Sequence, residues 1–162
     1  MRKLKFVALI LLLTVFNCES QNPTKFSEEA LNDTFVSLDG KSLSFKEILA
    51  NYEGKTILID VWASWCKDCI AGMPKMKELQ ESKQEIVYVF LSLDKSIDSW
   101  KNGIEKYKVE GEHYFMKSGW NGPFGTFLDL DWIPRYLVID EVQNIKIFKE
   151  IKVNKNLKNS LP

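Results

Sequence analysis

Two cysteines separated by two residues stand where a helix is predicted to begin. Cys66 and Cys69 flank Lys67 and Asp68. Side chains three apart on a helix share one face, with Cβ atoms about 5–6 Å apart, which is close to the spacing in a disulfide. The N-terminal end of a helix favours a thiolate at Cys66, and a thiolate is the form that attacks another disulfide. The pattern predicts thiol–disulfide exchange, in which Cys66 attacks and Cys69 resolves the mixed disulfide.

Two other interpretations of the pair carry less weight. A structural zinc ion needs four nitrogen or sulfur ligands, and beyond this pair the sequence offers only Cys18, in the N-terminal leader, and His113. A purely structural pair is the second alternative. About 130 ordered residues bury roughly two-thirds of the surface of their unfolded chain, so the fold does not need such a crosslink.

The composition excludes several classes of protein. The 162 residues carry equal numbers of basic and acidic side chains, so the formal net charge is zero, and no basic surface for nucleic acid is expected. Hydrophobic residues make up 45% of the chain and charged residues 27%, which is typical of one globular domain and not of a disordered chain. A single histidine excludes a site with two imidazoles.

The first residues have the pattern of an export signal. Basic residues at positions 2, 3 and 5 precede an apolar run over residues 6–16, which is too short to span a bilayer. Cys18 follows this leader in a pattern that resembles the lipobox of bacterial lipoproteins, which implies a diacylglycerol on its thiol. Direct cleavage by signal peptidase and an uncleaved anchor are the alternatives. We expect residues 1–17 to be a signal peptide, residues 18–33 a polar tether and residues 34–162 one domain.

Strand and helix patterns alternate along the rest of the chain. An Asp-Gly pair at residues 39–40 predicts a hairpin, and two continuous β-branched and aromatic runs predict buried strands at residues 56–62 and 86–91. Further elements are expected as helices at 45–52, at 66–82 and after Ser96, a strand at 113–116, an irregular loop at 119–125 and a closing hairpin over 136–148. This order predicts an α/β fold with a central mixed sheet flanked by helices.

The region around the cysteine pair resembles a known family. Residues 59–69 (IDVWASWCKDC) and the Met73-Pro74 pair are similar to the active-site region of thioredoxin-fold thiol–disulfide oxidoreductases of the TlpA/ResA (redoxin) branch. The resemblance extends over residues 33–150. It implies a thioredoxin-like fold, to which the predicted hairpin adds an N-terminal β-hairpin extension, and it assigns the two cysteines, in order, as nucleophile and resolving thiol. Residues 153–162 after the closing hairpin predict only a short C-terminal helix, which departs from the family's usual terminal helix.

The resemblance also assigns residues near the pair to substrate binding. Ile133 and Pro134 match the family's cis-proline loop, which packs opposite the disulfide and pairs with an extended substrate segment. An ordinary trans proline in a turn is the alternative. Trp65, directly before the nucleophile, belongs to the same expected binding surface.

Five further side chains have weaker assignments. Lys67 favours the Cys66 thiolate and Asp68 opposes it, so these two are expected to tune the redox potential in opposite directions. Trp120, Phe124 and Trp132 precede the proline loop. They either form an apolar rim that docks peptides or pack inside the fold.

Asp60 interrupts the strand predicted at residues 56–62. An unpaired buried carboxylate is costly, and desolvation raises its pKa, which suits a general base near neutral pH. Asp60 lies six residues before Cys66, where the family has a buried acid that carries the proton of the resolving thiol. A solvated aspartate at the end of the strand is the alternative.

The resemblance implies an extracytoplasmic oxidoreductase that acts as a reductant. Its expected partners are cysteines of exported proteins, for instance apocytochromes c, and a membrane thiol reductant that supplies the electrons. No cofactor besides the Cys66–Cys69 disulfide is expected, and no nucleic acid. We expect a monomer on the periplasmic side of a Gram-negative bacterium, attached to the membrane as a lipoprotein through Cys18.

Two alternatives belong to other functional classes. A thiol peroxidase would have Thr or Ser three residues before its cysteine and a supporting arginine, whereas this chain has Ala63 there and, beyond the leader, only Arg135. The other alternative is a non-catalytic interaction module or a copper carrier. Copper carriers of this fold use a wider Cys-x-x-x-Cys motif and a distal histidine.

Overall fold

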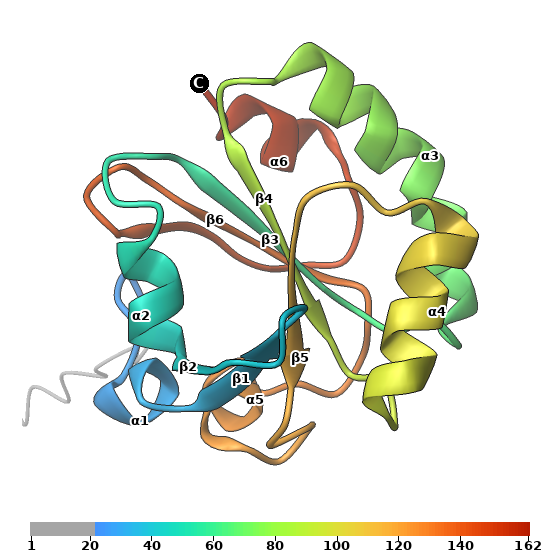
Figure 1. Ribbon diagram of the computed structural model, residues 1–162. Helices are drawn as coiled ribbons and strands as arrows, with labels where there is room; N and C mark the ends of the chain where they lie inside the picture. Colours follow the sequence, from blue (N-terminus) through green and yellow to red (C-terminus); the bar gives the residue numbers. More distant parts are fainter. Residues whose placement is uncertain (1–21) are drawn as a thin grey trace, which may run out of the picture.

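The sheet at the centre of the fold contains seven strands in the order β2-β1-β5-β4-β3-β6-β7 (Figure 1). The computed structural model describes residues 22–162, so the predicted signal peptide and Cys18 lie outside the described residues. The strands are β1 (Thr34–Ser37), β2 (Ser42–Ser44), β3 (Ile57–Trp62), β4 (Val87–Ser92), β5 (Glu112–Met116), β6 (Arg135–Ile139) and β7 (Ile145–Glu150). None of the helices in this range is long and apolar enough to cross a membrane.

β3 lies at the centre of the sheet and leads to the cysteine pair. It pairs in parallel with β4 and antiparallel with β6. All six of its residues are buried, as expected for a run of β-branched and aromatic side chains that is covered on both faces. The register places Asp60 between Phe90 of β4 and Tyr136 of β6.

Helices cover both faces of the sheet (Figure 1). The helices are α1 (Glu28–Leu31), α2 (Phe45–Ala50), α3 (Lys67–Ser82), α4 (Ile97–Tyr107), α5 (Pro123–Phe127) and α6 (Lys155–Asn159). Because parallel crossovers are right-handed, α3 and α4 lie on the same face. An aromatic cluster on the other face joins α2 to α5, with the rings of Phe45 and Phe124 4.6 Å apart. The predicted mixed sheet flanked by helices is confirmed, and the strand ends shift by one or two residues.

The segment predicted as a tether, residues 18–33, contacts the domain already before α1, since the Ile145 N–H donates to the Thr24 carbonyl oxygen and the Phe26 ring packs against Phe45. Ala30 in α1 is fully buried. The buried Asp33 accepts hydrogen bonds from the Ser118 hydroxyl and from the Phe124 N–H. The polar composition suggested a tether, but a few apolar side chains and one hydrogen-bonded carboxyl are enough to fix this segment to the sheet.

Two prolines lie within helices. Pro74 is inside α3, as the sequence predicts. Pro123 is the first residue of α5, which begins inside the stretch expected to be an irregular loop, residues 119–125. A proline suits this position because its missing N–H would have no partner within the helix. The Gly-Pro pair at residues 122–123 is therefore a helix start, where a loop had been expected.

Candidate active site

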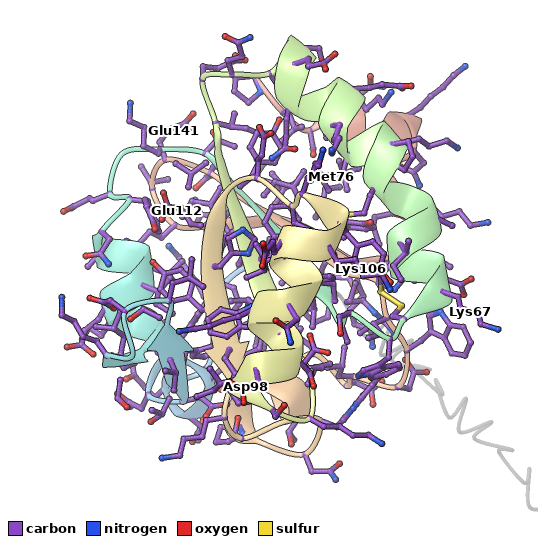
Figure 2. All side chains as sticks on the ribbon, turned by 45° about the vertical axis from the view of Figure 1, so that its right-hand side comes forward. Lys67, Met76, Asp98, Lys106, Glu112 and Glu141 are labelled. Carbon is purple, nitrogen blue, oxygen red and sulfur yellow. A yellow bond between two sulfur atoms is a disulfide. The ribbon has the colours of Figure 1, made fainter. Side chains whose placement is uncertain are left out.

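A disulfide joins Cys66 and Cys69 at the beginning of α3, with Cα atoms 5.3 Å apart. Figure 2 shows this bond beside Lys67, while Met76 lies further along the same helix. Cys66 is the N-cap residue, and its Sγ accepts the Cys69 N–H at 3.1 Å. An N–H aimed at this sulfur stabilises negative charge there once the disulfide opens. The helix start therefore makes Cys66 the better thiolate of the pair.

Both cysteines are largely buried, but only Cys66 lines the groove beside the disulfide. Cys66 is 6% exposed and Cys69 is 1% exposed. Cys69 belongs to the inner face of α3, together with Met73, Met76 and Leu79. A substrate disulfide therefore reaches Cys66 first, and Cys69 can act only on what is already bonded to Cys66.

The loop before β6 packs against the disulfide. The peptide bond between Ile133 and Pro134 is cis, as the resemblance implies. The carbonyl oxygen of Ile133 lies 3.6 Å from the Sγ of Cys66. The predicted cis-proline loop is therefore confirmed as a structure, and it borders the sulfur that is open to attack.

An aromatic groove runs past Cys66. Its volume is about 480 Å³, and it is lined by Trp65, Cys66, Lys67, Asp68, Trp120, Asp131, Trp132 and Ile133. Trp65 is 49% exposed and Trp132 is 56% exposed, which is unusual for side chains of this size. Phe124, by contrast, is fully buried in the aromatic cluster between α2 and α5. Of the three aromatic residues with two open interpretations, Trp120 and Trp132 line the groove and Phe124 packs in the core.

Asp60 is buried beneath α3, with 2% of its surface exposed. Its Oδ1 has no hydrogen-bond partner within residues 22–162. Burial raises the pKa of Asp60 to about 8, and a hydrogen bond from Tyr136 lowers it in part. The alternative of a solvated aspartate at a strand end is therefore wrong. A carboxyl with such a pKa can accept or release a proton near neutral pH.

The turn that leads into the site is fixed by a second buried acid, which sequence reasoning missed. Asp94 accepts hydrogen bonds from the N–H and the hydroxyl of Ser64 and from the hydroxyl of Ser92. Gly103 of α4 packs against Ser64, so closely that a Cβ at position 103 would lie 2.4 Å from the Ser64 Cβ. The signal in the sequence was an aspartate two residues after the end of a buried parallel strand, at the sheet edge where β3 leads to the cysteine pair.

The remaining candidate residues differ in their surroundings. Lys67 and Asp68 are both exposed on the first turn of α3. His113 is buried, with its Nε2 3.0 Å from the Val109 carbonyl oxygen and its ring stacked on Phe90. Burial lowers the pKa of His113 and so favours its uncharged form. An uncharged ring stacked on Phe90 contributes to packing. Within residues 22–162 there is no group of three His, Cys, Asp or Glu side chains that could hold a metal ion.

Comparisons with known proteins agree with this geometry. The family model described as thioredoxin-like matches residues 54–145, which is more than half of the chain. The thiol-disulfide oxidoreductase ResA of Bacillus thuringiensis is 28% identical over 88 residues, covering 53% of this chain and 49% of ResA. The chain thus spans about half the length of the curated relatives it matches.

Solved structures extend the likeness to most of the chain. A proposed thiol-disulfide oxidoreductase from Bacteroides vulgatus is 31% identical, with a TM-score of 0.62, and the match covers 83% of this chain and 82% of that one. The thioredoxin domain of another Bacteroides vulgatus oxidoreductase has a TM-score of 0.66 at 20% identity, covering 84% and 96% of the two chains. This second match supports the fold alone. The chain belongs to the thioredoxin-like family, and within it resembles the ResA oxidoreductases.

Proposed function

We propose that this protein is a thiol–disulfide oxidoreductase that exchanges the Cys66–Cys69 disulfide with cysteines of other proteins. The observation that carries the proposal is the disulfide itself: it caps a helix, its first sulfur borders an aromatic groove, and its second is buried. The names of the ResA relatives support the same activity. The exposed aromatic surface beside Cys66 suits a protein substrate with apolar side chains near its cysteine.

The reaction with a substrate disulfide proceeds in two steps. The Cys66 thiolate attacks one substrate sulfur, forming a mixed disulfide and releasing the other substrate sulfur as a thiolate. Cys69 then gives its proton to the Asp60 carboxylate and attacks the Sγ of Cys66. The bond between Cys66 and the substrate breaks, and the electron pair leaves with the substrate sulfur. Two electrons have moved from the protein to the substrate, and the Cys66–Cys69 disulfide remains.

The setting of the reaction follows from the leader sequence and from the resemblance. We place the protein outside the cytoplasm on the periplasmic side, attached through a lipidated Cys18, where it acts as a monomeric reductant of exported proteins such as apocytochromes c. A membrane thiol reductant would regenerate its dithiol. The basic and apolar pattern of residues 1–17 supports this placement. Mass spectrometry of the membrane fraction tests the anchor, and an intact N-terminus with an unmodified Cys18 would contradict it.

Insulin reduction tests the proposed activity. With excess dithiol, the wild-type protein should reduce insulin, and Cys66→Ser should abolish this reduction. Peroxide consumption without insulin reduction would indicate a thiol peroxidase instead, and neither activity would indicate a non-catalytic module. The reduction potential of the pair, measured against glutathione, decides direction: a value near that of thioredoxin, about −270 mV, supports a reductant, and a value near about −120 mV an oxidant.

A further inference from the structure

Asp60 has one polar neighbour in its row of the sheet. Phe90 lies opposite it on β4 and offers no hydrogen-bonding group, whereas Tyr136 lies opposite it on β6. As the cross-strand partner of Asp60, Tyr136 brings its hydroxyl near enough to lower the pKa of the carboxyl, while Asp60 Oδ1 has no hydrogen-bond partner among the described residues. A proton that Asp60 receives from Cys69 therefore needs a way out of a buried site, and Tyr136 is the group in contact with it.

Tyr136 is almost completely buried, with 1% of its surface exposed, but it borders a hollow in the surface. Together with Gly72 and Pro134 it lines a hollow of about 400 Å³ between α3 and the segment after β7, and Asp60 does not line this hollow. A Cβ at Gly72 would lie 3.3 Å from the Tyr136 hydroxyl oxygen. Gly72 is three residues beyond Cys69 on α3, so the hydroxyl lies under the turn that follows the resolving cysteine. The absence of a side chain at position 72 leaves room for the hydroxyl there.

We propose that Tyr136 is a positioning residue that passes the proton of the resolving step from Asp60 to water in this hollow. The inference rests on the proposed function. After Cys69 has given its proton to Asp60, the Asp60 carboxyl transfers that proton to the Tyr136 oxygen while the Tyr136 O–H bond releases its own proton to water. Tyr136 ends the step unchanged and uncharged, and Asp60 returns to the carboxylate.

Other titratable groups surround this pair without replacing Tyr136. They are Asp68 and Lys75 of α3, Lys152 after β7, Glu150 of β7 and His113 of β5. The first three line the same hollow as Tyr136, where they can influence the released proton, but Asp60 does not line this hollow. The carboxyl of Glu150 is engaged by Asn154 and Asn156, and His113 is separated from Asp60 by Phe90.

A disulfide substrate with a fluorophore on each half separates the two steps. The first half is released when Cys66 forms the mixed disulfide, and the second when Cys69 resolves it. In single-turnover stopped flow with the reduced full-length protein, Tyr136→Phe should leave the first release unchanged and slow the second about tenfold at pH 7. Its pH profile should also move to higher pH, because Asp60 loses the hydrogen bond that lowers its pKa.

Tyr88→Phe is the matched control. Its hydroxyl donates to the Leu79 and Lys83 carbonyl oxygens at the far end of the same helix. This variant removes a buried tyrosine hydroxyl from α3 packing but not from Asp60, so both releases should keep their rates and pH profiles. Equal slowing of the second release in both tyrosine variants would overturn the relay and leave a packing effect.

A double-mutant cycle separates this inference from the proposed function. Asp60→Asn should slow the second release, and the double variant Asp60→Asn/Tyr136→Phe should be no slower, because Tyr136 acts through Asp60. Two results would overturn the relay but not the proposed function. One is a slow second release in Asp60→Asn with a normal second release in Tyr136→Phe, and the other is additive slowing of the second release in the double variant. No release of either half by the wild type overturns the proposed function. If Tyr136→Phe does not fold, Gly72→Ala, whose added Cβ crowds the hydroxyl, should slow the second release about threefold, and an unchanged second release would overturn the relay.

Discussion

Two buried aspartates belong to neighbouring parallel strands, one inside β3 and the other just beyond β4, and they are used in opposite ways. Asp94, just beyond β4, accepts hydrogen bonds from the backbone and hydroxyl of Ser64 and from the hydroxyl of Ser92. Asp60, within β3, has one carboxyl oxygen with no hydrogen-bond partner in the part of the chain that the structure describes. A fully bonded carboxyl fixes geometry, because moving it breaks several bonds at once. A carboxyl with an unbonded oxygen is costly to bury, and its proton remains available for chemistry.

The comparison explains how one sheet edge serves both stability and reactivity. Asp94 holds Ser64, two residues before Cys66, and so fixes the turn that presents the reactive sulfur. Asp60 lies behind the disulfide, under α3, with its pKa raised by burial.

Replacing Asp60 with asparagine should stabilise the folded protein at alkaline pH. The pKa of Asp60 is about 8 when folded and 3.8 in its ordinary state, so between pH 4 and 8 the folded chain holds a proton that the unfolded chain has lost. Wild-type stability therefore falls as pH rises through this window. At ~1.4 kcal/mol for each pKa unit, Asp60→Asn should gain on the order of 5 kcal/mol at pH 8 and little at pH 4.

Denaturant unfolding of the oxidised protein at both pH values measures this gain. Asp68→Asn, which changes an exposed aspartate on α3, is the control and should follow the wild type. Equal stability of wild type and Asp60→Asn across the whole range would show that Asp60 is not the buried acid described above.

Replacing Asp94 with alanine should have the opposite effect on stability. The Ser64 N–H and the two serine hydroxyls lose their acceptor, which costs about 3 kcal/mol. Displacement of the turn should also slow the reaction of Cys66 with a substrate disulfide about tenfold. Unfolding midpoints and stopped-flow rates measure the two effects. Asp33→Ala is the control: Asp33 is also buried but is distant from Cys66 in the sequence, so this variant should lose stability without changing the rate at which Cys66 reacts. If Asp94→Ala lowered stability but left the Cys66 reaction as fast as in the wild type, Asp94 would not be needed to position Cys66.

Gly103→Ala disturbs the Asp94 region without touching a carboxyl. The added Cβ would lie 2.4 Å from the Ser64 Cβ, so either α4 or the turn must move. Such overpacking costs about 1–3 kcal/mol. Thermal unfolding should show this loss, whereas a Gly103→Ala protein with wild-type stability would mean that the contact between α4 and Ser64 is loose.

The aromatic groove should give the smallest effect. Trp132→Ala removes exposed apolar surface beside Cys66, so KM for a protein substrate should rise about fivefold, or ~1 kcal/mol, with kcat unchanged. Val142→Ala serves as the control, because Val142 is also an exposed apolar residue but lies in the turn between β6 and β7 and does not line the groove. A kcat that falls with an unchanged KM would assign Trp132 to the chemistry and not to binding.

Local patterns were sufficient to predict most of the fold and the centre of the site. Continuous apolar runs identify β3 and β4, Asp39 and Gly40 identify the first hairpin, and the cysteine spacing identifies the start of α3. These features depend on residues that are close in the chain. The predicted export signal and the lipidation of Cys18 remain predictions, because they fall outside the described residues.

The rest depends on contacts between residues far apart in the sequence. Tyr136 becomes the partner of Asp60 only through strand register, and no local pattern marks that pairing. Asp94 and Gly103 act on Ser64 across 30 or more positions. The segment before β1 looked like a tether because its few apolar residues gain their burial only from the folded sheet.

Alkylation of Cys66 as a function of pH, in the reduced protein, tests the central claim most directly. The rate should rise at a pH well below 8.5, the value for a free thiol, and should show a second inflection near pH 8, where Asp60 titrates. Asp60→Asn should keep the first inflection and lose the second. A single inflection near 8.5, identical in both proteins, would contradict both the activated sulfur and the buried acid behind it.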